Sequence, residues 1–485
     1  MRRSSKLVAV RVALSALAAV WLLGATVPTV AAASSRGGTR AIPTNVDTSV
    51  RAGNEAEQTI AINPTNPRNV VVMSTLPDVV SGLFEGYSFD GGKTWTKQVI
   101  ANGGPLGTAC CDEALSWDSF GNLWLTYLYT TSGTVPVAVS TDGGKTFTLV
   151  TNVQPTLQGR TRGPRPATKG TRFWSRAASS DQPSIATGAG SVWITYTSEP
   201  SVVVQAAGAP VTGLGVYGSF GAPQSVPTTT GKGDYGDIAI GPSGQVLVIY
   251  QFPTGGETGS KVYTSLDADG LGAGGFATPR LLASSKVGGF DFIPAQAGRS
   301  IDAEANLAWD RSGGAHNGRV YAVWTQETPN ESNNTDIMFQ SSDDNGATWT
   351  TAVKVNTDTG TNSQFMQSIA VDQATGYVGL SWYDCRNDLG TGGSGDTNGV
   401  ANDDAQIWGA FSRNGSTFTA NRQLSAGTSN SADAGSVLDY GDYTHAAFQS
   451  HLFEPVWSDN SNSTANNPNG ALHKLDILVT RVNVT

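Results

Sequence analysis

The sequence has 485 residues, a formal net charge of −9 at pH 7, three cysteines and 58 glycines beside a charged fraction of only 14%. The acidic balance argues against nucleic acid or an anionic membrane surface as the main partner. Three cysteines are too few for a disulfide-rich scaffold, and abundant glycine with few charges is typical of an exported all-β protein with many turns.

The first 33 residues have the pattern of a secretory signal peptide. Four basic residues precede an apolar run from about Val12 to Val27, and Ala31–Ala33 offers a small-residue cleavage site. The run is too short for a membrane anchor, and no later stretch approaches the roughly 20 apolar residues that span a bilayer. We therefore expect a secreted, extracellular protein that begins near Ser34, with residues 34–54 as linker and closing strand.

A short phrase of the form Ser-x-Asp-x-Gly-x-Thr-aromatic occurs three times, in Ser88–Trp95, Ser140–Phe147 and Ser342–Trp349. Its Asp-Gly or Asn-Gly step supplies the positive φ of a tight hairpin, and its aspartate can accept hydrogen bonds from the turn itself. Two less regular copies occupy Ser265–Phe276 and Ser412–Phe418. The phrase predicts a structural turn between two strands and not a catalytic site.

This phrase resembles the Asp-box, or BNR repeat, of the sialidase and neuraminidase superfamily, whose members are β-propellers. The resemblance implies a ring of four-stranded blades in which the box joins the third strand of a blade to the fourth. It says little about the reaction, because propellers with different activities share the box.

A second, longer repeat lies between these hairpins. Its pattern is an acidic or amide residue, an apolar-Ala-apolar core, a Gly-containing turn and a further apolar run. The seven copies begin at Glu57, Asp112, Asp181, Asp234, Asp302, Gln364 and Asp442. Their spacing of roughly 50 to 75 residues fits propeller blades with variable loops. We therefore predict an all-β, single-domain propeller over residues 55–485 with seven blades, six being the alternative.

The last copy is followed by only one convincing strand, Leu475–Val482, so its blade lacks an outer strand. The segment Thr44–Arg51 is expected to supply that strand. Pairing the N-terminal segment onto the last blade would close the ring and hide both sheet edges.

In a propeller, the loops before each first strand and after each second strand open on one face, so their side chains converge at one end of the axis. Crowded carboxylates there raise one another's pKa, which produces a general acid at neutral pH. Capping the start of a strand is the alternative role for any one acid. The candidate catalytic residues are Tyr443, Tyr440, Asp442, Glu304, Asp302, Asp112 and Glu113. The candidate substrate-binding residues are Arg176, Arg299, Arg386, Asp384, Asp181, Asp237 and His445.

The resemblance to sialidases implies three arginines around a substrate carboxylate, a tyrosine nucleophile activated by a glutamate, and an aspartate as acid/base. The three arginines above, Tyr440 or Tyr443, and Glu304 or Asp442 would fill these roles. The family's Phe/Tyr-Arg-Ile-Pro phrase is absent, since Arg40–Pro43 has its arginine one place early and lacks the aromatic residue. The resemblance thus implies a sialidase-like exo-glycoside hydrolase with a glycan substrate.

Other functions remain open at this stage. On a neutral glycan, two carboxyl groups would serve as acid and as nucleophile or base. A polysaccharide lyase would use His445 or Tyr443 as the base, and a non-catalytic propeller would bind a glycan or a protein through the same face. We expect a monomer.

No cofactor is expected, although a structural calcium ion is possible. Asp384, Asp388, Asp442 and Asp459 are hard oxygen ligands of the kind that calcium prefers, whereas the four histidines lack zinc-site spacing. The adjacent Cys110 and Cys111 allow either a disulfide between neighbours or a bond from one of them to Cys385.

Overall fold

The computed structural model describes residues 41–79, 81–156, 180–199, 202–254 and 256–485. One compact unit spans Ile42–Thr485. In the described residues, regular structure is β except for two short 3-10 turns, η1 (Gly104–Leu106) and η2 (Pro294–Gln296). No helix in this part of the chain is long and apolar enough to cross a bilayer.

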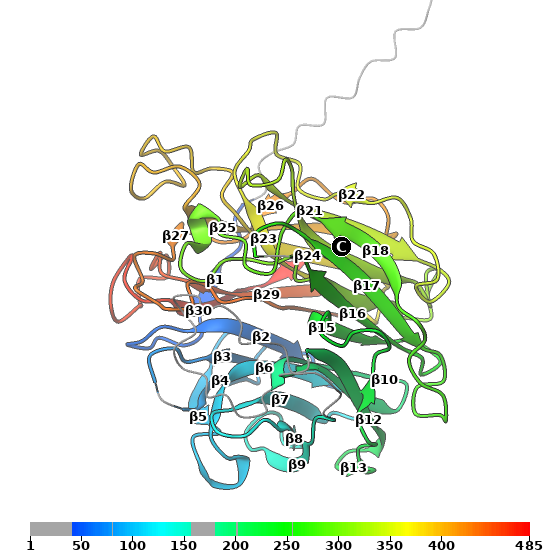
Figure 1. Ribbon diagram of the computed structural model, residues 1–485. Helices are drawn as coiled ribbons and strands as arrows, with labels where there is room; N and C mark the ends of the chain where they lie inside the picture. Colours follow the sequence, from blue (N-terminus) through cyan, green and yellow to red (C-terminus); the bar gives the residue numbers. More distant parts are fainter. Residues whose placement is uncertain (1–40, 80, 157–179, 200–201, 255) are drawn as a thin grey trace, which may run out of the picture. The chain divides into compact units, whose positions relative to one another are not determined.

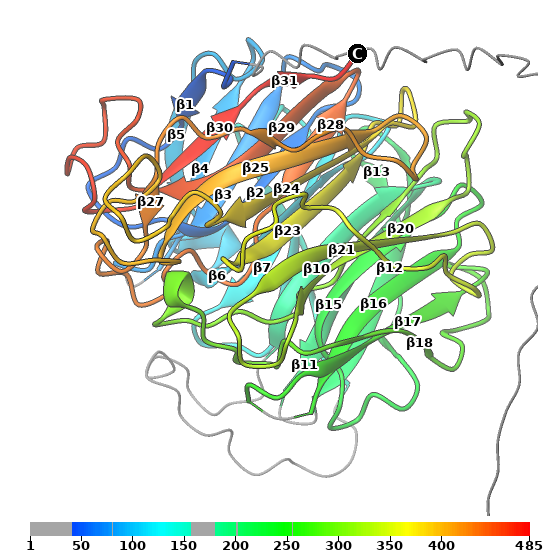
Figure 2. The same ribbon diagram turned by 90° about the horizontal axis from the view of Figure 1, so that it is seen from above.

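The strands form seven antiparallel sheets that follow one another around a ring, so the fold is a seven-bladed β-propeller (Figures 1 and 2). This confirms the predicted fold class and blade number. Blades 1 and 2 contain β2 (Ala56–Ile62), β3 (Val70–Thr75), β4 (Leu83–Ser88), β5 (Thr96–Ile100), β6 (Ala109–Trp117), β7 (Leu123–Tyr129), β8 (Val135–Ser140) and β9 (Thr148–Val153).

The next four blades repeat this order, two of them with an additional short strand. Blades 3 and 4 contain β10 (Ser180–Gly188), β11 (Ser191–Ser198), β12 (Val203–Gly213), β13 (Val216–Tyr217), β14 (Gln224–Ser225), β15 (Asp234–Ile240), β16 (Val246–Pro253), β17 (Ser260–Asp267) and β18 (Arg280–Ser285). Blades 5 and 6 contain β19 (Asn306–Trp309), β20 (Val320–Glu327), β21 (Thr335–Ser342), β22 (Val353–Lys354), β23 (Gln364–Val371), β24 (Val378–Asp384), β25 (Asp404–Ser412), β26 (Arg422–Gln423) and β27 (Ser429–Asn430).

Blade 7 is completed by the N-terminal segment, as the sequence predicts. Its strands are β28 (Ala446–Gln449), β29 (Leu452–Asp459), β30 (Asp476–Thr480), β31 (Val482–Asn483) and β1 (Asn45–Asp47). Strand β1 pairs antiparallel with β30, with Asn45 opposite Thr480 (Figure 2). The short β31 pairs with β29, an addition that the sequence did not indicate.

The hydrophobic core lies between neighbouring blades. One cluster joins Leu247 of blade 4 to Trp324 of blade 5, and another joins Trp124 of blade 2 to Ile194 of blade 3. Each sheet is therefore covered on both faces. This explains why the second strands, such as β7, carry apolar residues at successive positions and do not alternate between apolar and polar residues.

The repeated Asp phrase forms the turn that was predicted for it. Between β4 and β5, the Ser88 and Thr94 hydroxyls donate to Asp90 at 2.8 and 2.7 Å, and the Gly92 N–H donates to Ser88 Oγ at 2.9 Å. Gly91 and Gly92 have φ of 77° and 75°, a conformation that favours glycine. The same bonds recur around Asp142 and Asp344.

Candidate active site

The first strands share a distortion near the axis. Six blades place a residue other than glycine in the left-handed region: Glu57 (φ 57°), Asp112 (57°), Gln182 (43°), Tyr235 (51°), Glu304 (33°) and Met366 (49°). In five of them, the register with the second strand shifts at this residue. Such a bulge re-aims a side chain and is held by its surroundings, because the conformation costs about 1–2 kcal/mol. We call these six residues the mouth ring.

Residues close in sequence to the mouth ring line one cavity of about 130 Å³, and they come from six blades. Its polar lining includes Ser184, Asp237, Asn306, Ser368 and His445, all from first strands or the residues just before them. The first strands therefore surround the axis, and the mouth ring gathers side chains from different blades there.

Four carboxyl groups from blades 1, 2, 3 and 7 interact electrostatically: Glu57, Asp112, Asp181 and Asp442. We call them the mouth cluster. Gln182 links two of its members, because its backbone N–H donates to Asp112 Oδ2 at 3.1 Å and its Nε2 donates to Asp442 Oδ2 at 3.2 Å. Residues more than 300 positions apart in sequence are thus brought together, as the repeat pattern predicted.

Arg299 brings a positive charge to this cluster. Its loop connects blades 4 and 5 and reaches blade 7, where the Gly298 and Arg299 N–H groups donate to Asp439 Oδ2 at 2.7 and 2.9 Å. The Arg299 guanidinium donates to Asp442 Oδ2. Burial by itself would lower the pKa of Arg299, but the negative charges of Asp442 and Glu57 hold this pKa above its ordinary value.

The cluster acids differ in their electrostatic environments. Burial, with repulsion from Asp442, raises the pKa of Glu57 to about 7, and Arg299 opposes this shift. Burial raises the pKa of Asp112 well above its ordinary value, with further contributions from Glu57 and two aspartates. Burial also raises the pKa of Asp442, but the Arg299 charge is the largest effect in the opposite direction. Arg299 thus opposes the rise in pKa at both acids, and it donates a hydrogen bond directly to Asp442.

A second pair of acids, Asp302 and Glu304, lies close to Asp442. The Glu304 N–H donates to Asp302 Oδ1 at 2.6 Å. Burial raises the pKa of both carboxyl groups well above the ordinary range, and Asp302 raises that of Glu304 further. Among the described residues, Glu304 Oε2, Glu113 Oε1 and Gln182 Oε1 are buried and have no hydrogen-bond partner.

The two candidate tyrosines have different surroundings. Tyr443 is 7% exposed and lies near Asp112 and Glu57, where burial and these acids raise its pKa well above 10. Tyr440 is fully buried, donates to the Ser429 carbonyl at 2.9 Å, and stacks on Tyr383 with ring centres 4.4 Å apart. Of the two side chains, only that of Tyr443 lies beside the mouth cluster, whereas Tyr440 reaches it through its carbonyl oxygen, which accepts from the Glu57 N–H at 3.4 Å.

Asp237 and His445 lie in the axial cavity. Asp237 accepts from the Ile238 and Leu307 N–H groups at 2.7 and 2.8 Å, and burial raises its pKa to about 6. These bonds fit the strand-capping alternative for Asp237. His445 Nδ1 is 3.2 Å from the Gln58 carbonyl oxygen, and burial lowers its pKa. A neutral His445 thus donates from Nδ1 and leaves Nε2 as an acceptor.

The remaining candidates do not join the cluster in the described structure. The Arg386 guanidinium pairs with Asp384 (Nε–Oδ1 2.9 Å) and lies 3.8 Å from Asp358, and it stacks over Trp408 with its Cζ 4.0 Å from the ring centre. Arg176 lies outside the described residues. Of the three arginines expected around a substrate carboxylate, Arg299 alone is placed at the mouth cluster.

The four acids expected as calcium ligands are not grouped together. Among the described residues, one set of three acids can place carboxylate oxygens within 4.8 Å of one another: Asp388, Asp403 and Asp404. Of the expected ligands, only Asp388 belongs to this set.

The sequence family described as BNR/Asp-box repeat matches residues 87–97. Those residues hold the Asp90 turn, and the same hydrogen bonds recur twice in this seven-bladed ring. The chain is a seven-bladed β-propeller that carries Asp-box repeats. No curated protein matches its sequence.

The propeller is similar in structure to several solved proteins. A protein of unknown function from Dyadobacter fermentans is 13% identical with a TM-score of 0.47, over 93% of this chain and 100% of that one. The α-L-arabinofuranosidase Arb93A from Fusarium graminearum is 14% identical with a TM-score of 0.45, over 72% and 93%. The Hadza microbial sialidase Hz136 is 12% identical with a TM-score of 0.43, over 90% and 68%.

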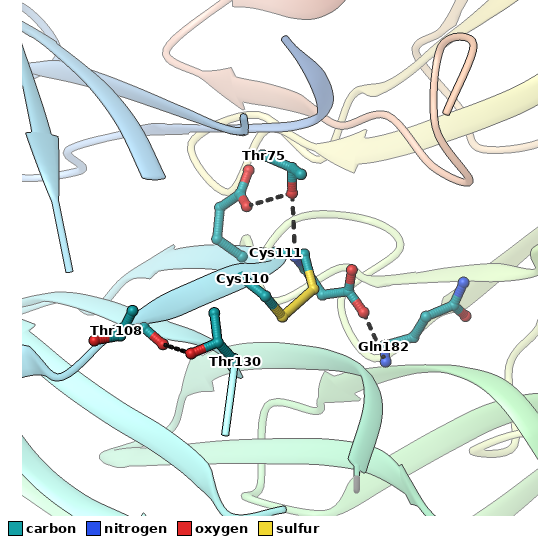
Figure 3. Close-up of a disulfide and its surroundings, with 8 residues drawn as sticks. Thr75, Thr108, Cys110, Cys111, Thr130 and Gln182 are labelled. Atoms are coloured by element: carbon teal, nitrogen blue, oxygen red, sulfur yellow. Dashed lines mark hydrogen bonds between the residues drawn. A yellow bond between two sulfur atoms is a disulfide. The ribbon is translucent and has the colours of Figure 1, made fainter. Parts of the chain in front are cut away.

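The cysteines of this Asp-box propeller resolve the alternative left open above. Cys110 and Cys111 form a disulfide with each other, and Cys385 is a buried free thiol. Figure 3 shows the sulfur bridge near Thr75 and Gln182, which belong to the two neighbouring blades.

Sequence reasoning missed Glu57, Gln182 and Tyr235 as site residues. A signal for Glu57 was present, because it begins the first copy of the longer repeat at the position that Asp112 occupies in the second. Without the bulge, however, its side-chain direction could not be inferred.

Proposed function

We propose that this propeller is an exo-acting glycoside hydrolase in which Glu57 and Asp442 are the catalytic carboxyl groups. The observation that carries the proposal is the contrast between these two interacting acids. Glu57 is buried with a pKa near 7, whereas Asp442 is bonded directly to the Arg299 guanidinium. Two carboxyl groups with different protonation states are what glycosidic bond cleavage requires.

In this mechanism, Glu57 donates its proton to the leaving glycosidic oxygen, which otherwise departs as a poor leaving group. Asp442, ion-paired with Arg299, attacks the anomeric carbon or activates a water molecule. The Asp112 carboxyl, whose pKa burial raises, donates in its protonated form a hydrogen bond to a sugar hydroxyl, and this bond strengthens in the transition state.

A neutral sugar is the favoured substrate. The mouth cluster has four carboxyl groups, and Arg299 is the cation that the described residues place beside it. Among the described residues, Arg299 is already paired with Asp442 and Arg386 is already paired within blade 6, so a sialic acid or uronate carboxylate would lack an unpaired cation to bind. These observations support a neutral glycoside over a sialoside and over a lyase substrate.

The test is hydrolysis of a panel of chromogenic neutral glycosides and a sialoside. We expect cleavage of a neutral glycoside, with kcat lowered about 1,000-fold in both Glu57→Gln and Asp442→Asn, since general acid–base catalysis contributes about 10²–10⁴. Asp90→Asn, which changes an Asp-box acid, is the matched control and should retain activity.

Three results would change the proposal. Full activity in both site variants would exclude the assigned acids. Cleavage of the sialoside that Tyr443→Phe abolishes would instead support a sialidase. If the folded protein cleaves nothing on the panel, a carbohydrate-binding propeller becomes the better description.

A further inference from the structure

A disulfide between adjacent residues directly precedes two acids at the mouth. Cys110 and Cys111 form this bond in β6, and Asp112 and Glu113 follow them. Cys110 is partly exposed, whereas Cys111 is buried. The bond thus lies at the border between solvent and the mouth cluster.

Blade 2 is distorted more than its neighbours at this point. The register between β6 and β7 shifts twice, between Ala109 and Cys111 and again between Cys111 and Ala114. In each of the other four bulged blades, the first strand shifts only once against the second. The additional irregularity coincides with the cysteine pair and leads directly into Asp112, whose φ is 57°.

The hydrogen bonds that hold Asp112 are long. Its N–H donates to Thr75 Oγ1 at 3.2 Å, the Thr75 hydroxyl donates to Glu113 Oε2 at 3.2 Å, and Asp112 Oδ2 accepts from the Gln182 N–H at 3.1 Å. Figure 3 shows Thr75 and Gln182 on two sides of the sulfur bridge. These contacts must keep Asp112 in an unfavourable backbone conformation and beside other acids.

A disulfide between neighbours supplies the constraint that these bonds lack. It closes a small ring through the peptide that joins the two cysteines and removes torsional freedom immediately before Asp112. The conformations that would swing this carboxyl out of the cluster are thereby restricted, in the way that a cross-link reduces conformational entropy.

We infer that the Cys110–Cys111 disulfide positions the Asp112 carboxyl in the mouth cluster, and that its reduction releases Asp112 and lowers turnover. The effect on turnover rests on the proposed glycosidase function, whereas the effect on position does not. In the reaction, a dithiol gives two electrons and two protons, the sulfur–sulfur bond breaks, two cysteine thiols form, and the dithiol becomes a disulfide.

The kinetic experiment compares three forms of the wild-type protein: oxidised, reduced with dithiothreitol, and reoxidised. On reduction we expect kcat to fall about 10- to 100-fold, because small displacements at a reacting centre cost up to about 100-fold. We expect KM to change less than about twofold and the pH profile of kcat to shift. Reoxidation should restore kcat and its pH profile.

Two variants serve as references for the kinetics. Cys110→Ala/Cys111→Ala should resemble the reduced protein and should no longer respond to dithiothreitol. Cys385→Ala, which removes the buried free thiol, should respond as the wild type does. A rise in KM with kcat unchanged would overturn the inference, since it would mean that the disulfide binds substrate and does not position Asp112.

Hydrogen exchange gives a readout that does not depend on activity. On reduction, exchange should accelerate in Ala109–Trp117 and at Gln182 but not in Leu452–Asp459 of blade 7. If exchange changes as expected and no glycoside is cleaved, the proposed function fails and the positioning role stands. Unchanged exchange at Asp112 would overturn the positioning role, and so would equal acceleration in all blades, which would indicate a general structural role.

Discussion

Two sets of aspartates in this propeller have opposite properties. Asp90 in the Asp-box is partly exposed and accepts hydrogen bonds from the Thr94 side chain and its own turn, which lower its pKa. Asp112 in the mouth cluster is buried among other acids, which raises its pKa. Donors close in sequence stabilise the charge in the first case, whereas tertiary burial destabilises it in the second. Aspartate therefore stabilises a turn at one end of the strands, as at Asp90, and belongs to the proposed active site at the other end, as at Asp112.

Replacing Arg299 with alanine should give the largest effect on this contrast. We expect kcat/KM to fall about 100- to 1,000-fold, because truncating one partner of a buried charge pair costs about 2–5 kcal/mol. The pKa of Glu57 should also rise, since Arg299 lowers it. Steady-state kinetics across pH measure both effects. Arg319→Ala, which removes an arginine paired with the exposed Asp343, is the control. Unchanged kcat/KM in Arg299→Ala would contradict the arrangement.

Activity should fall as the pH rises through about 7, because Glu57 must be protonated to act as the acid and its pKa lies near 7. Between pH 7 and pH 9 we expect a decrease of about 50-fold in kcat, with a slope that approaches tenfold per pH unit above pH 8. The pH–rate profile measures this limb, which should be retained in Asp90→Asn. A flat profile over this range in the wild type would exclude Glu57 as the acid.

Buried acids outside the mouth test the effect of burial without any assay of activity. Burial, with Asp47 and Glu55, raises the pKa of Asp476 on the closing strand pair to about 9. Because the folded pKa lies above the unfolded value, this group favours folding below about pH 4 and loses that contribution as the pH rises through 9. Asp476→Asn should therefore raise the free energy of unfolding at pH 8 by about 1–3 kcal/mol.

Urea denaturation at pH 4 and pH 8 measures this difference, which should be small at pH 4. Asp343→Asn, at an exposed position paired with Arg319, is the matched control. An equal change at both pH values would show that Asp476 is not protonated by burial.

The smallest effect is expected at the Asp-box. Asp142→Ala removes hydrogen bonds from the Ser140 hydroxyl at 2.8 Å and the Thr146 N–H at 3.0 Å, and should lower the free energy of unfolding by about 1 kcal/mol. Burial raises the pKa of Asp142, but the hydrogen bonds from Thr146 and Ser140 together outweigh it and lower the pKa below its ordinary value, so this contribution should be lost as the pH falls below 3.8. Denaturation at pH 7 and pH 3 tests it, with the exposed Asp433→Ala as reference. A loss that does not depend on pH would argue against a charged acceptor.

The fold was predictable because its signals are local and repeated. The Ser88–Trp95 phrase encodes a turn through its own hydrogen bonds, and the longer repeat marks each blade by the order of apolar and small residues. The incomplete last copy also indicated that residues near Asn45 close the ring. None of these inferences needed the directions of side chains.

The site was predictable only in part. Asp112, Asp442 and Tyr443 were expected at the mouth, because propeller topology brings the starts of the first strands together. Tyr440 was also expected there, but its side chain stacks on Tyr383, and only its carbonyl oxygen contacts Glu57. Glu57 was missed, since its role follows from a backbone bulge that no residue type announces.

The sequence by itself thus determined the blades, their turns and the closure of the ring, because hydrogen bonds within a turn and the periodicity of a strand depend on neighbours in the chain. Only the tertiary structure decided the partner of Cys110, the pairing of Arg299 with Asp442, and the raised pKa of Glu57. The Arg299–Asp442 pair and the pKa of Glu57 depend on how blades distant in sequence exclude water and bring charges together. The partner of Cys110 depends on the local path of the backbone at the mouth.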